Sequence, residues 1–221
     1  MGRKRRDHIH SVIVSYNRLE LTQQAIRSYL DTVTLPHSLI VVDNGSDYHT
    51  VHQIEQDLVD AGEGMLVLLG ENRYPGFATN RGWEGMPPAT TLLHRADNDF
   101  AFLPGWCDHV MAVLENQAVG QVGLRTGDEE LWNTHNVGGN CVVRRKLWDK
   151  GLRYDERPWG EGYDPGWTED SLLSPAVVRL GYRWARVAVP CIRSLSWEDA
   201  NDPYYQESWR VRGIKPPESM T

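Results

Sequence analysis

The hydrophobic positions in the first half of the chain follow two alternating periods. Short runs rich in Val, Ile and Leu, typical of strands buried on both faces, occupy residues 10–15, 39–42 and 65–69. Between these runs, apolar residues recur at helical spacing over about 21–30 and 48–61. Strands and helices that alternate at this spacing predict right-handed crossovers and a parallel sheet.

The second half of the chain is less regular. Its patterns predict strands over 90–95, 119–124, 137–143 and 183–189, and helices over 77–83, 105–114 and 169–180. Gly, Pro and aromatic residues dominate 151–167, which we expect to be a loop. The chain is therefore predicted to be α/β, with a mostly parallel central sheet flanked by helices and an irregular C-terminal half. We expect a basic tail over 1–7, one domain over 8–197 and an extension over 198–221.

Charge and cysteine content narrow the class of protein. The 221 residues include 23 Lys plus Arg and 30 Asp plus Glu, and four of the basic residues lie in 3–6. The remaining 19 basic and 30 acidic residues make an acidic body, which argues against non-specific nucleic-acid binding.

No uncharged apolar run reaches the ~18 residues of a membrane-spanning helix. Cys107, Cys141 and Cys191 match neither a disulfide framework nor a zinc pattern, so we expect buried thiols and a cytoplasmic, reducing compartment. The basic tail is either solvated or a weak tether to an anionic surface.

Polar clusters follow all four strands of the predicted parallel sheet. They occupy residues 15–18, 43–46, 71–73 and 97–99. Because ligands of open parallel sheets bind beyond the carboxyl ends of the strands, the clusters together predict a site for a polar ligand.

Asp97 and Asp99 can point the same way from an extended segment and share Mg²⁺ or Mn²⁺. The alternative is that Asp99 caps the next turn and Asp97 is solvated. Gly76, between the third strand and a helix, either lets the backbone approach an anionic ligand or simply belongs to a turn. This segment is neither a Walker loop nor a dinucleotide-binding fingerprint.

A Trp-rich loop precedes a pair of acidic residues at a helix start. Asp170 is a candidate general base and Trp159 and Trp167 are candidates to stack on sugar rings. The alternative is that Thr168 caps the helix, with Glu169 and Asp170 complementing its dipole.

Taken in order, these segments resemble the motifs of family 2 glycosyltransferases, which have the GT-A fold. The matching stretches are Ser11–Arg18, Val41–Ser46, Asn72–Gly82, Asp97–Asp99 and Glu169–Asp170. The resemblance covers about residues 10–190. It implies inverting transfer of a sugar from a nucleoside diphosphate donor, by family habit a UDP-sugar, with a divalent cation (Mn²⁺ or Mg²⁺). It also implies a nucleotide-binding half over 8–100 and an acceptor half over 101–197.

The resemblance assigns roles residue by residue. Nucleotide and donor contacts are expected from Ser15, Tyr16, Asn17, Asp43, Arg73, Gly76, Asn80, Asp97, Gly139 and Asn140. Among these, Asp43 is expected to bind the base, and Asp97 the ribose or, through water, the metal. Asp99 is implied as the direct metal ligand, and Asp170 as the catalytic base with Glu169 beside it.

One motif of the family is missing. Members often have a His after the last strand, near the diphosphate, but residues 189–196 contain none. Either the metal has one ligand fewer, or Arg193 supplies the positive charge. The acceptor stays open between a glycan, a protein side chain and a modified nucleobase. A nucleotidyltransferase, a retaining transferase and a non-catalytic nucleotide-sugar or glycan-binding module are the competing interpretations.

Overall fold

The fold is built on a seven-stranded sheet whose strands are ordered β3-β2-β1-β4-β7-β6-β8. The computed structural model describes residues 7–126, 137–164, 167–196, 206 and 210–211. The strands are β1 (Ile9–Ser15), β2 (His37–Asp43), β3 (Met65–Leu68), β4 (Leu92–Asp97), β6 (Val119–Gly123), β7 (Cys141–Arg144) and β8 (Arg183–Arg186). β1 pairs in parallel with β2 and β4, β2 with β3, and β6 with β8, whereas β7 is antiparallel to both β4 and β6.

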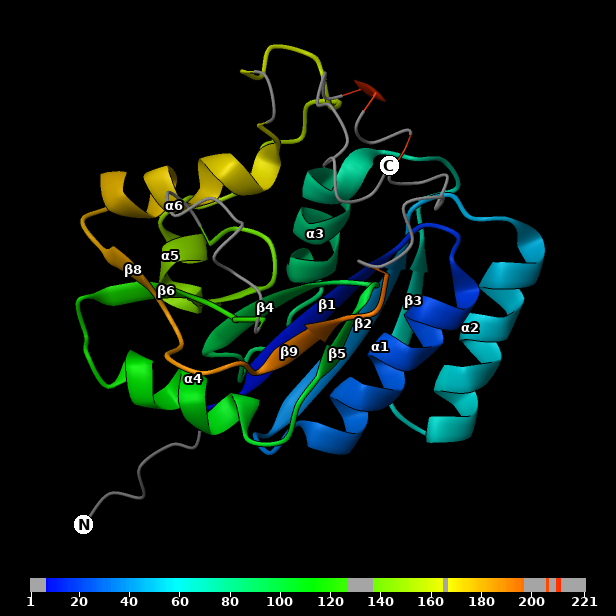
Figure 1. Cartoon of the computed structure of the whole chain (residues 1–221), viewed down its shortest axis with the longest axis horizontal. Helices are drawn as coiled ribbons and strands as arrows, with labels where there is room; N and C mark the ends of the chain where they lie inside the picture. Colours follow the sequence, from blue (N-terminus) through cyan, green and yellow to red (C-terminus); the bar gives the residue numbers. More distant parts are fainter. Residues whose placement is uncertain (1–6, 127–136, 165–166, 197–205, 207–209, 212–221) are drawn as a thin grey trace.

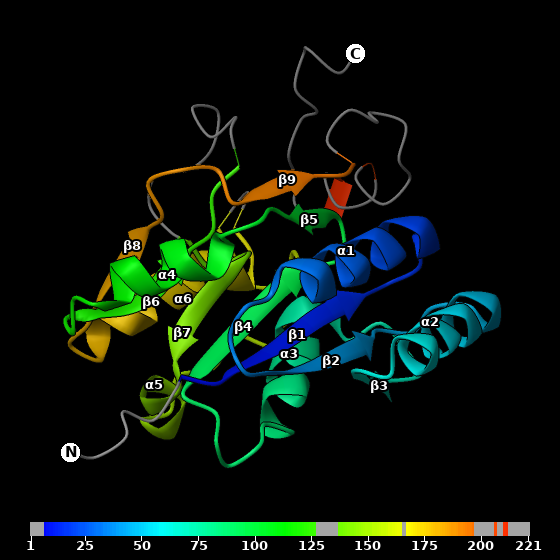
Figure 2. The ribbon, with the colours of Figure 1, turned by 90° about the horizontal axis from the view of Figure 1, so that it is seen from below.

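Helices cover both faces of this sheet (Figure 1, Figure 2). The helices are α1 (Leu19–Thr32), α2 (Tyr48–Ala61), α3 (Tyr74–Glu84), α4 (Trp106–Leu114), α5 (Arg145–Asp149) and α6 (Glu169–Arg179). Side chains alternate between the faces, so Ile13 packs in a core with α1, α2 and α4, and Val12 in a second core with α3, α5 and α6. Gly82 brings α3 close to the sheet, because a Cβ there would collide with the Val12 methyl groups.

The predicted α/β class and mostly parallel sheet are confirmed, and so are the three leading strands and their two helices. The three cysteines are free and buried, as expected. Within the described residues, no helix combines the length and apolar character needed to cross a bilayer. The basic residues 3–6 and almost all of the 198–221 extension lie outside the described part of the chain.

Several predicted boundaries in the second half are wrong. The fourth strand ends at Asp97 rather than at Arg95, and the strand expected over 137–143 occupies Cys141–Arg144. The sequence pattern also missed α5 and a small second sheet, in which β5 (Phe100–Phe102) pairs antiparallel with β9 (Ile192–Ser194). These strands have three residues each, too few to show a period. Because β9 lies beside β5, Leu195 and Ser196, which follow β9, contact Asp99.

His94 is a buried titratable group in the core between the sheet and α1 and α4. Its Nδ1 lies 3.0 Å from the Ser11 Oγ, and the rings of Tyr29, Phe102 and Trp106 surround it. Burial lowers the pKa of His94 from 6.5 to about 3, so the folded protein holds this imidazole neutral.

We therefore expect the free energy of unfolding to fall as the pH drops from about 6.5 toward 3. Over this range the unfolded chain binds a proton at His94 that the folded chain does not, which costs about 1.4 kcal/mol per pH unit. Urea unfolding at pH 7, 6 and 5 should show a shallower decline for His94→Gln than for the wild type. His52→Gln, on an exposed imidazole of α2, is the control and should keep the wild-type slope. Equal slopes for all three proteins would contradict the assignment to His94.

Candidate functional site

The carboxyl ends of β1 to β4 surround a cavity of about 350 Å³ together with the start of α6. This is where an open parallel sheet binds its ligands. The lining residues are Val14, Tyr16, Arg18, Asn44, Asn72, Tyr74, Pro75, Arg95, Asp97, Asn98, Asp99, Phe100, Trp159, Thr168, Glu169, Asp170 and Val211. The structure thus brings together the strand-end clusters and the acidic helix start that the sequence singled out separately.

Asp97 lies at the centre of this site. Asn140 receives the backbone N–H of Asp97 at 3.0 Å on its Oδ1, and its Nδ2 donates to Asp97 Oδ2 at 3.4 Å. Burial raises the pKa of Asp97, and the negative charges of Asp99 and Asp170 raise it further, while Arg95 opposes the shift. About a third of the Asp97 side chain remains exposed, so this carboxylate is available to a ligand in the cavity.

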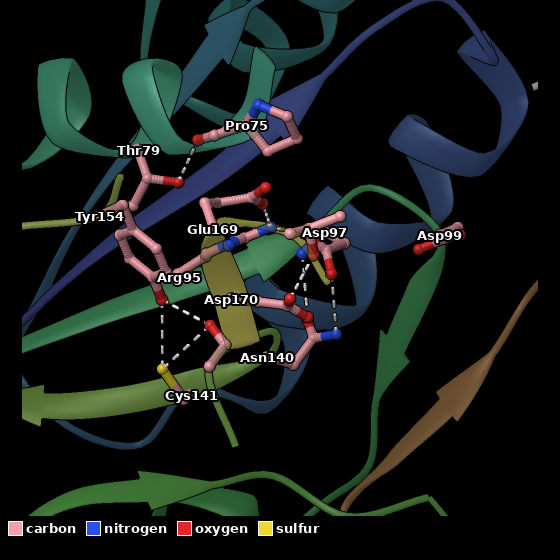
Figure 3. Close-up of polar contacts among 12 residues, drawn as sticks. Pro75, Thr79, Arg95, Asp97, Asp99, Asn140, Cys141, Tyr154, Glu169 and Asp170 are labelled. Atoms are coloured by element: carbon pink, nitrogen blue, oxygen red, sulfur yellow. Dashed lines mark hydrogen bonds and ion pairs between the residues drawn. The ribbon is translucent and has the colours of Figure 1, made fainter. Parts of the chain in front are cut away.

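Asp170 lies beside Asp97 and Asn140 (Figure 3). Its Oδ1 accepts hydrogen bonds from the hydroxyls of Thr168 and, at 3.2 Å, Ser171. The Oδ2 atoms of Asp170 and Asp97 each lie 3.7 Å from the place a Cβ of Gly139 would occupy. The expected cap is also present, because Thr168 and Ser171 form a reciprocal capping box at α6. Capping and presentation of Asp170 are therefore both served by this helix start.

Glu169 lines the cavity, but its carboxylate is engaged in a buried ion pair. Arg95 Nη2 donates to Glu169 Oε1 at 2.9 Å and to Asp97 Oδ1 at 3.0 Å, and the Trp159 indole N–H donates to Glu169 Oε2 at 2.6 Å. The guanidinium also lies 4.8 Å from the centroid of the Tyr154 ring. Because the Glu169 side chain is only 2% exposed and both its oxygens are engaged, it holds other groups in place rather than meeting a ligand.

Asp99 is tied to the strand-one loop. Its Oδ2 accepts from Arg18 Nη1 at 3.2 Å and from the Ser196 hydroxyl at 3.0 Å. Among the described residues, no group of three His, Cys, Asp or Glu side chains is arranged to hold a metal ion. A cation at Asp97 and Asp99 would therefore complete its coordination with water and ligand oxygens, which suits Mg²⁺ and Mn²⁺.

Of residues 15–17, which the sequence predicts to contact a nucleotide, only Tyr16 lines the cavity. Ser15 is buried with its Oγ 3.2 Å from Thr22 Oγ1. Asn17 has φ 51° and joins two loops, since its N–H donates to Ser46 Oγ and its Oδ1 accepts from the Asp47 N–H.

Asp43 is buried beneath the same loops. Its Oδ2 accepts the N–H groups of Gly45 and Ser46 at 3.1 and 3.0 Å. Its Oδ1 is buried and has no hydrogen-bond partner within the described residues. A buried acceptor without a donor is costly, so this oxygen is a candidate for a ligand N–H.

The residues predicted between 73 and 80 have other partners. Arg73 pairs with Glu71 on the surface at 3.1 Å. A Cβ on Gly76 would collide with the Asp155 carbonyl oxygen, so Gly76 permits an approach to the 155 loop rather than to a ligand. Asn80 donates to the Tyr154 carbonyl at 2.9 Å and accepts the Tyr154 N–H at 3.0 Å. Gly76 and Asn80 thus fasten α3 to the loop that carries Trp159.

Three predicted residues remain. Trp159 lines the cavity, whereas Trp167, 36% exposed, and Arg193, exposed on β9, are not among its lining residues. The expected proximity of Arg193 to a leaving group therefore has no support in this arrangement.

Sequence reasoning overlooked Arg95, the side chain of Arg18, and Tyr74. A charged residue two positions before Asp97, inside a strand, was the available signal for Arg95, because residues i and i+2 share a face. Tyr74 carries no such signal. Its φ of 63° is left-handed, which costs a side chain other than glycine about 1–2 kcal/mol.

We expect Arg95→Met to lower the free energy of unfolding by about 3–5 kcal/mol, because it leaves the buried Glu169 without its counter-charge. Urea or guanidinium unfolding measures the loss. Arg81→Met is the control, since the Arg81–Glu84 pair is half exposed and should contribute at most about 1 kcal/mol. A similar small effect for both variants would show that Arg95 does not hold the site together.

Comparison with solved structures finds the same fold in other proteins, among them a mannosyltransferase. Mannosyltransferase PcManGT from Pyrobaculum calidifontis, in complex with GDP-Man and Mn²⁺, matches 95% of this chain with a TM-score of 0.73 and 17% identity, and the chain covers 61% of it. S. aureus TarS 1-349 matches 96% of this chain with a TM-score of 0.67 and 13% identity, over 67% of its own length. The TarS complex with UDP-GlcNAc matches 85% of this chain with a TM-score of 0.65 and 13% identity, over 58% of that chain.

A search of curated proteins found no match. The model of Glycosyl transferase family 2, however, matches residues 11–166, most of the described domain and every strand end that faces the cavity. The chain therefore belongs to glycosyltransferase family 2, whose members are enzymes that transfer a sugar from a nucleotide-sugar donor.

Proposed function

We propose that this protein transfers a sugar from a nucleoside diphosphate donor, with UDP-sugars as the first choice, to an acceptor hydroxyl with inversion at the anomeric carbon. The observation that carries the proposal is the facing pair of carboxylates Asp97 and Asp170 across Gly139. Asp97 lies at the end of a parallel strand, where open sheets bind their ligands, and Asp170 has one oxygen that accepts no hydrogen bond from the described residues and is proposed to take a proton. The complexes of PcManGT with GDP-Man and Mn²⁺ and of TarS with UDP-GlcNAc support a donor of this class.

The charge of the cavity favours a divalent cation. Among the described residues, four carboxylates and two guanidiniums line it, an excess of two acidic groups; these groups are Asp97, Asp99, Glu169, Asp170, Arg18 and Arg95. A diphosphate is itself an anion, so it would be repelled unless a cation accompanied it. Asp97 and Asp99 are the residues proposed to hold Mn²⁺ or Mg²⁺. Such an ion would supply positive charge to the departing nucleoside diphosphate.

The nucleoside is proposed to occupy the end of the cavity lined by Tyr16, Asn44 and Asn72. Asn44 and Asn72 are already oriented, since Asn44 Nδ2 donates to Asn72 Oδ1 at 3.0 Å and Asn44 Oδ1 accepts the Arg73 N–H at 2.8 Å. The Tyr16 ring offers a face for base stacking. The unpartnered Oδ1 of Asp43, below these residues, suits a base that donates an N–H, as uracil does.

Asp170 is proposed as the general base. The hydroxyls of Thr168 and Ser171 hold its Oδ1, so its Oδ2 is left to accept the proton of the acceptor hydroxyl as that oxygen attacks. Glu169 is proposed to act through other groups, since Arg95 and Trp159 occupy its two oxygens. The two neighbouring acids therefore divide the work between base and positioning residue.

A thermal-shift screen of UDP-, GDP- and TDP-sugars, each with and without Mn²⁺, tests the proposal directly. A ligand that binds only the folded protein raises its stability in proportion to RT ln(1 + [L]/Kd), and the acceptor need not be known. A rise for one class of nucleotide sugar that depends on Mn²⁺ is the expected result. No rise with any nucleotide sugar would contradict the proposal.

Asp170→Asn should lower the rate of sugar transfer, or of donor hydrolysis where no acceptor is known, by about 10²- to 10⁴-fold. Donor affinity should stay near the wild-type value, because Asn keeps the side-chain volume and can still accept from Thr168. Asp108→Asn, on an exposed acid of α4, is the control and should leave the rate unchanged. Wild-type turnover by Asp170→Asn would remove Asp170 from the role.

Asp99→Asn should abolish the Mn²⁺-dependent part of donor binding while leaving the fold intact, since Asn can still accept from Arg18 and Ser196. Calorimetric titration of donor in Mn²⁺ and in EDTA measures that difference. Donor binding by the wild type with equal affinity in EDTA would refute the cation site.

A further inference from the structure

Two aromatic rings from distant parts of the chain form one wall of the cavity. Tyr74 comes from the β3–α3 turn and Trp159 from the loop before α6, and their ring centroids lie 5.9 Å apart at 53°. Both rings are half-buried, so each keeps part of its surface open. They line the same cavity as Asp170, and Trp159 bonds to Glu169, the residue before Asp170 in the chain.

Trp159 is fixed rather than loosely packed. Its indole N–H donates at 2.6 Å to Glu169 Oε2, and the ion pair with Arg95 holds Glu169 in turn. A surface tryptophan needs no buried carboxylate as a partner. The buried carboxylate of Glu169 thus fixes the orientation of the Trp159 ring at the cavity. Rigid binding surfaces are built from side chains that are fixed in this way.

Tyr74 is held in a backbone conformation that favours glycine. Its φ is 63°, and its N–H donates to Asn72 Oδ1 at 2.9 Å. The close approach of Gly76 to the Asp155 carbonyl fixes the following turn against the loop that carries Trp159. A bulky ring at a left-handed position is a strained choice, and such strain gathers at binding sites.

We propose that Tyr74 and Trp159 form a subsite for a pyranose ring, either the transferred sugar or a sugar of the acceptor. This inference rests on the proposed function and deepens it. A pyranose presents an apolar C–H face that packs on aromatic rings, while its hydroxyls bind carboxylates. Asp97 and Asp170 lie in the same cavity to meet those hydroxyls, and the fixed Trp159 sets the orientation of the ring against them.

Substitutions at Tyr74 can test binding without lowering stability, because the tyrosine backbone there is strained. Tyr74→Gly and Tyr74→Asn remove the ring and place a residue that tolerates positive φ, so their unfolding midpoints should match or exceed that of the wild type. Tyr74→Phe keeps the ring and should behave as the wild type in every assay. Tyr48→Ala, on a tyrosine that is 83% exposed on α2, is the control outside the cavity.

Binding is measured by calorimetry in Mn²⁺ with UDP against UDP-GlcNAc and with GDP against GDP-mannose. Methyl glycosides of glucose, galactose, mannose and N-acetylglucosamine are tested by saturation-transfer NMR with the matching nucleoside diphosphate present. The glycine and asparagine variants should bind the free diphosphate as the wild type does. They should lose about three- to tenfold in affinity for the nucleotide sugar, if the ring holds the donor's sugar, or for a methyl glycoside, if it holds the acceptor's.

Either of these losses supports the subsite and identifies its sugar. Three results overturn it: an equal loss of affinity for the free diphosphate, no loss for any sugar, or a lowered unfolding midpoint that accounts for the loss. If the wild type binds no nucleotide sugar at all, the proposed function fails instead. A wild type that binds one while Tyr74→Gly binds it equally well removes the subsite alone.

Discussion

The buried guanidinium of Arg95 is the interaction on which the site depends. One of its nitrogens bonds to Asp97 at the end of β4 and to Glu169 at the start of α6, so a single side chain joins the two elements that face each other across the cavity. Without it, two carboxylates would share a low-dielectric space with no counter-charge, and one of them would protonate or withdraw. Arg95 therefore sets both the spacing and the charge of the groups around it.

This constraint explains why two adjacent acids differ in role. Both acids line the cavity, but residues i and i+1 of a helix point in different directions, so their carboxylates have different partners. The Glu169 side chain faces Arg95 and Trp159, and each of its two carboxylate oxygens accepts a hydrogen bond there. Asp170 is held through its Oδ1, which accepts the hydroxyls of Thr168 and Ser171, and its Oδ2 has no hydrogen-bond donor among the described residues. Among the described lining residues, acidic groups outnumber basic ones, and this is why the proposed diphosphate donor is expected to bind together with a cation.

The fold of the first half could be predicted from the sequence, because the strands there are buried on both faces and their apolar runs are continuous. The sequence also indicates that Asp97, Tyr16 and Asp170 lie at the cavity, since the first two are at strand ends and the third is at a helix start, where open parallel sheets place their ligand-facing side chains. It fails for Gly76 and Asn80, whose partners lie in the 154–156 loop. Such contacts depend on how a long irregular segment folds back, and no local period records that.

The proposed role of Tyr74 follows from its backbone conformation, which the sequence pattern did not indicate. A turn between a strand and a helix is satisfied by many residues, and glycine would adopt φ 63° without strain. An aromatic residue there gains nothing for the turn itself, so its benefit has to come from its ring, which contacts Trp159 and faces the cavity. The strained backbone of Tyr74 and the buried Glu169 carboxylate that bonds to the Trp159 indole each cost stability, and they belong to two distant segments of the chain. Both orient rings on the same wall of the cavity, and this shared position is the reason that the two rings are proposed to bind the apolar face of a sugar.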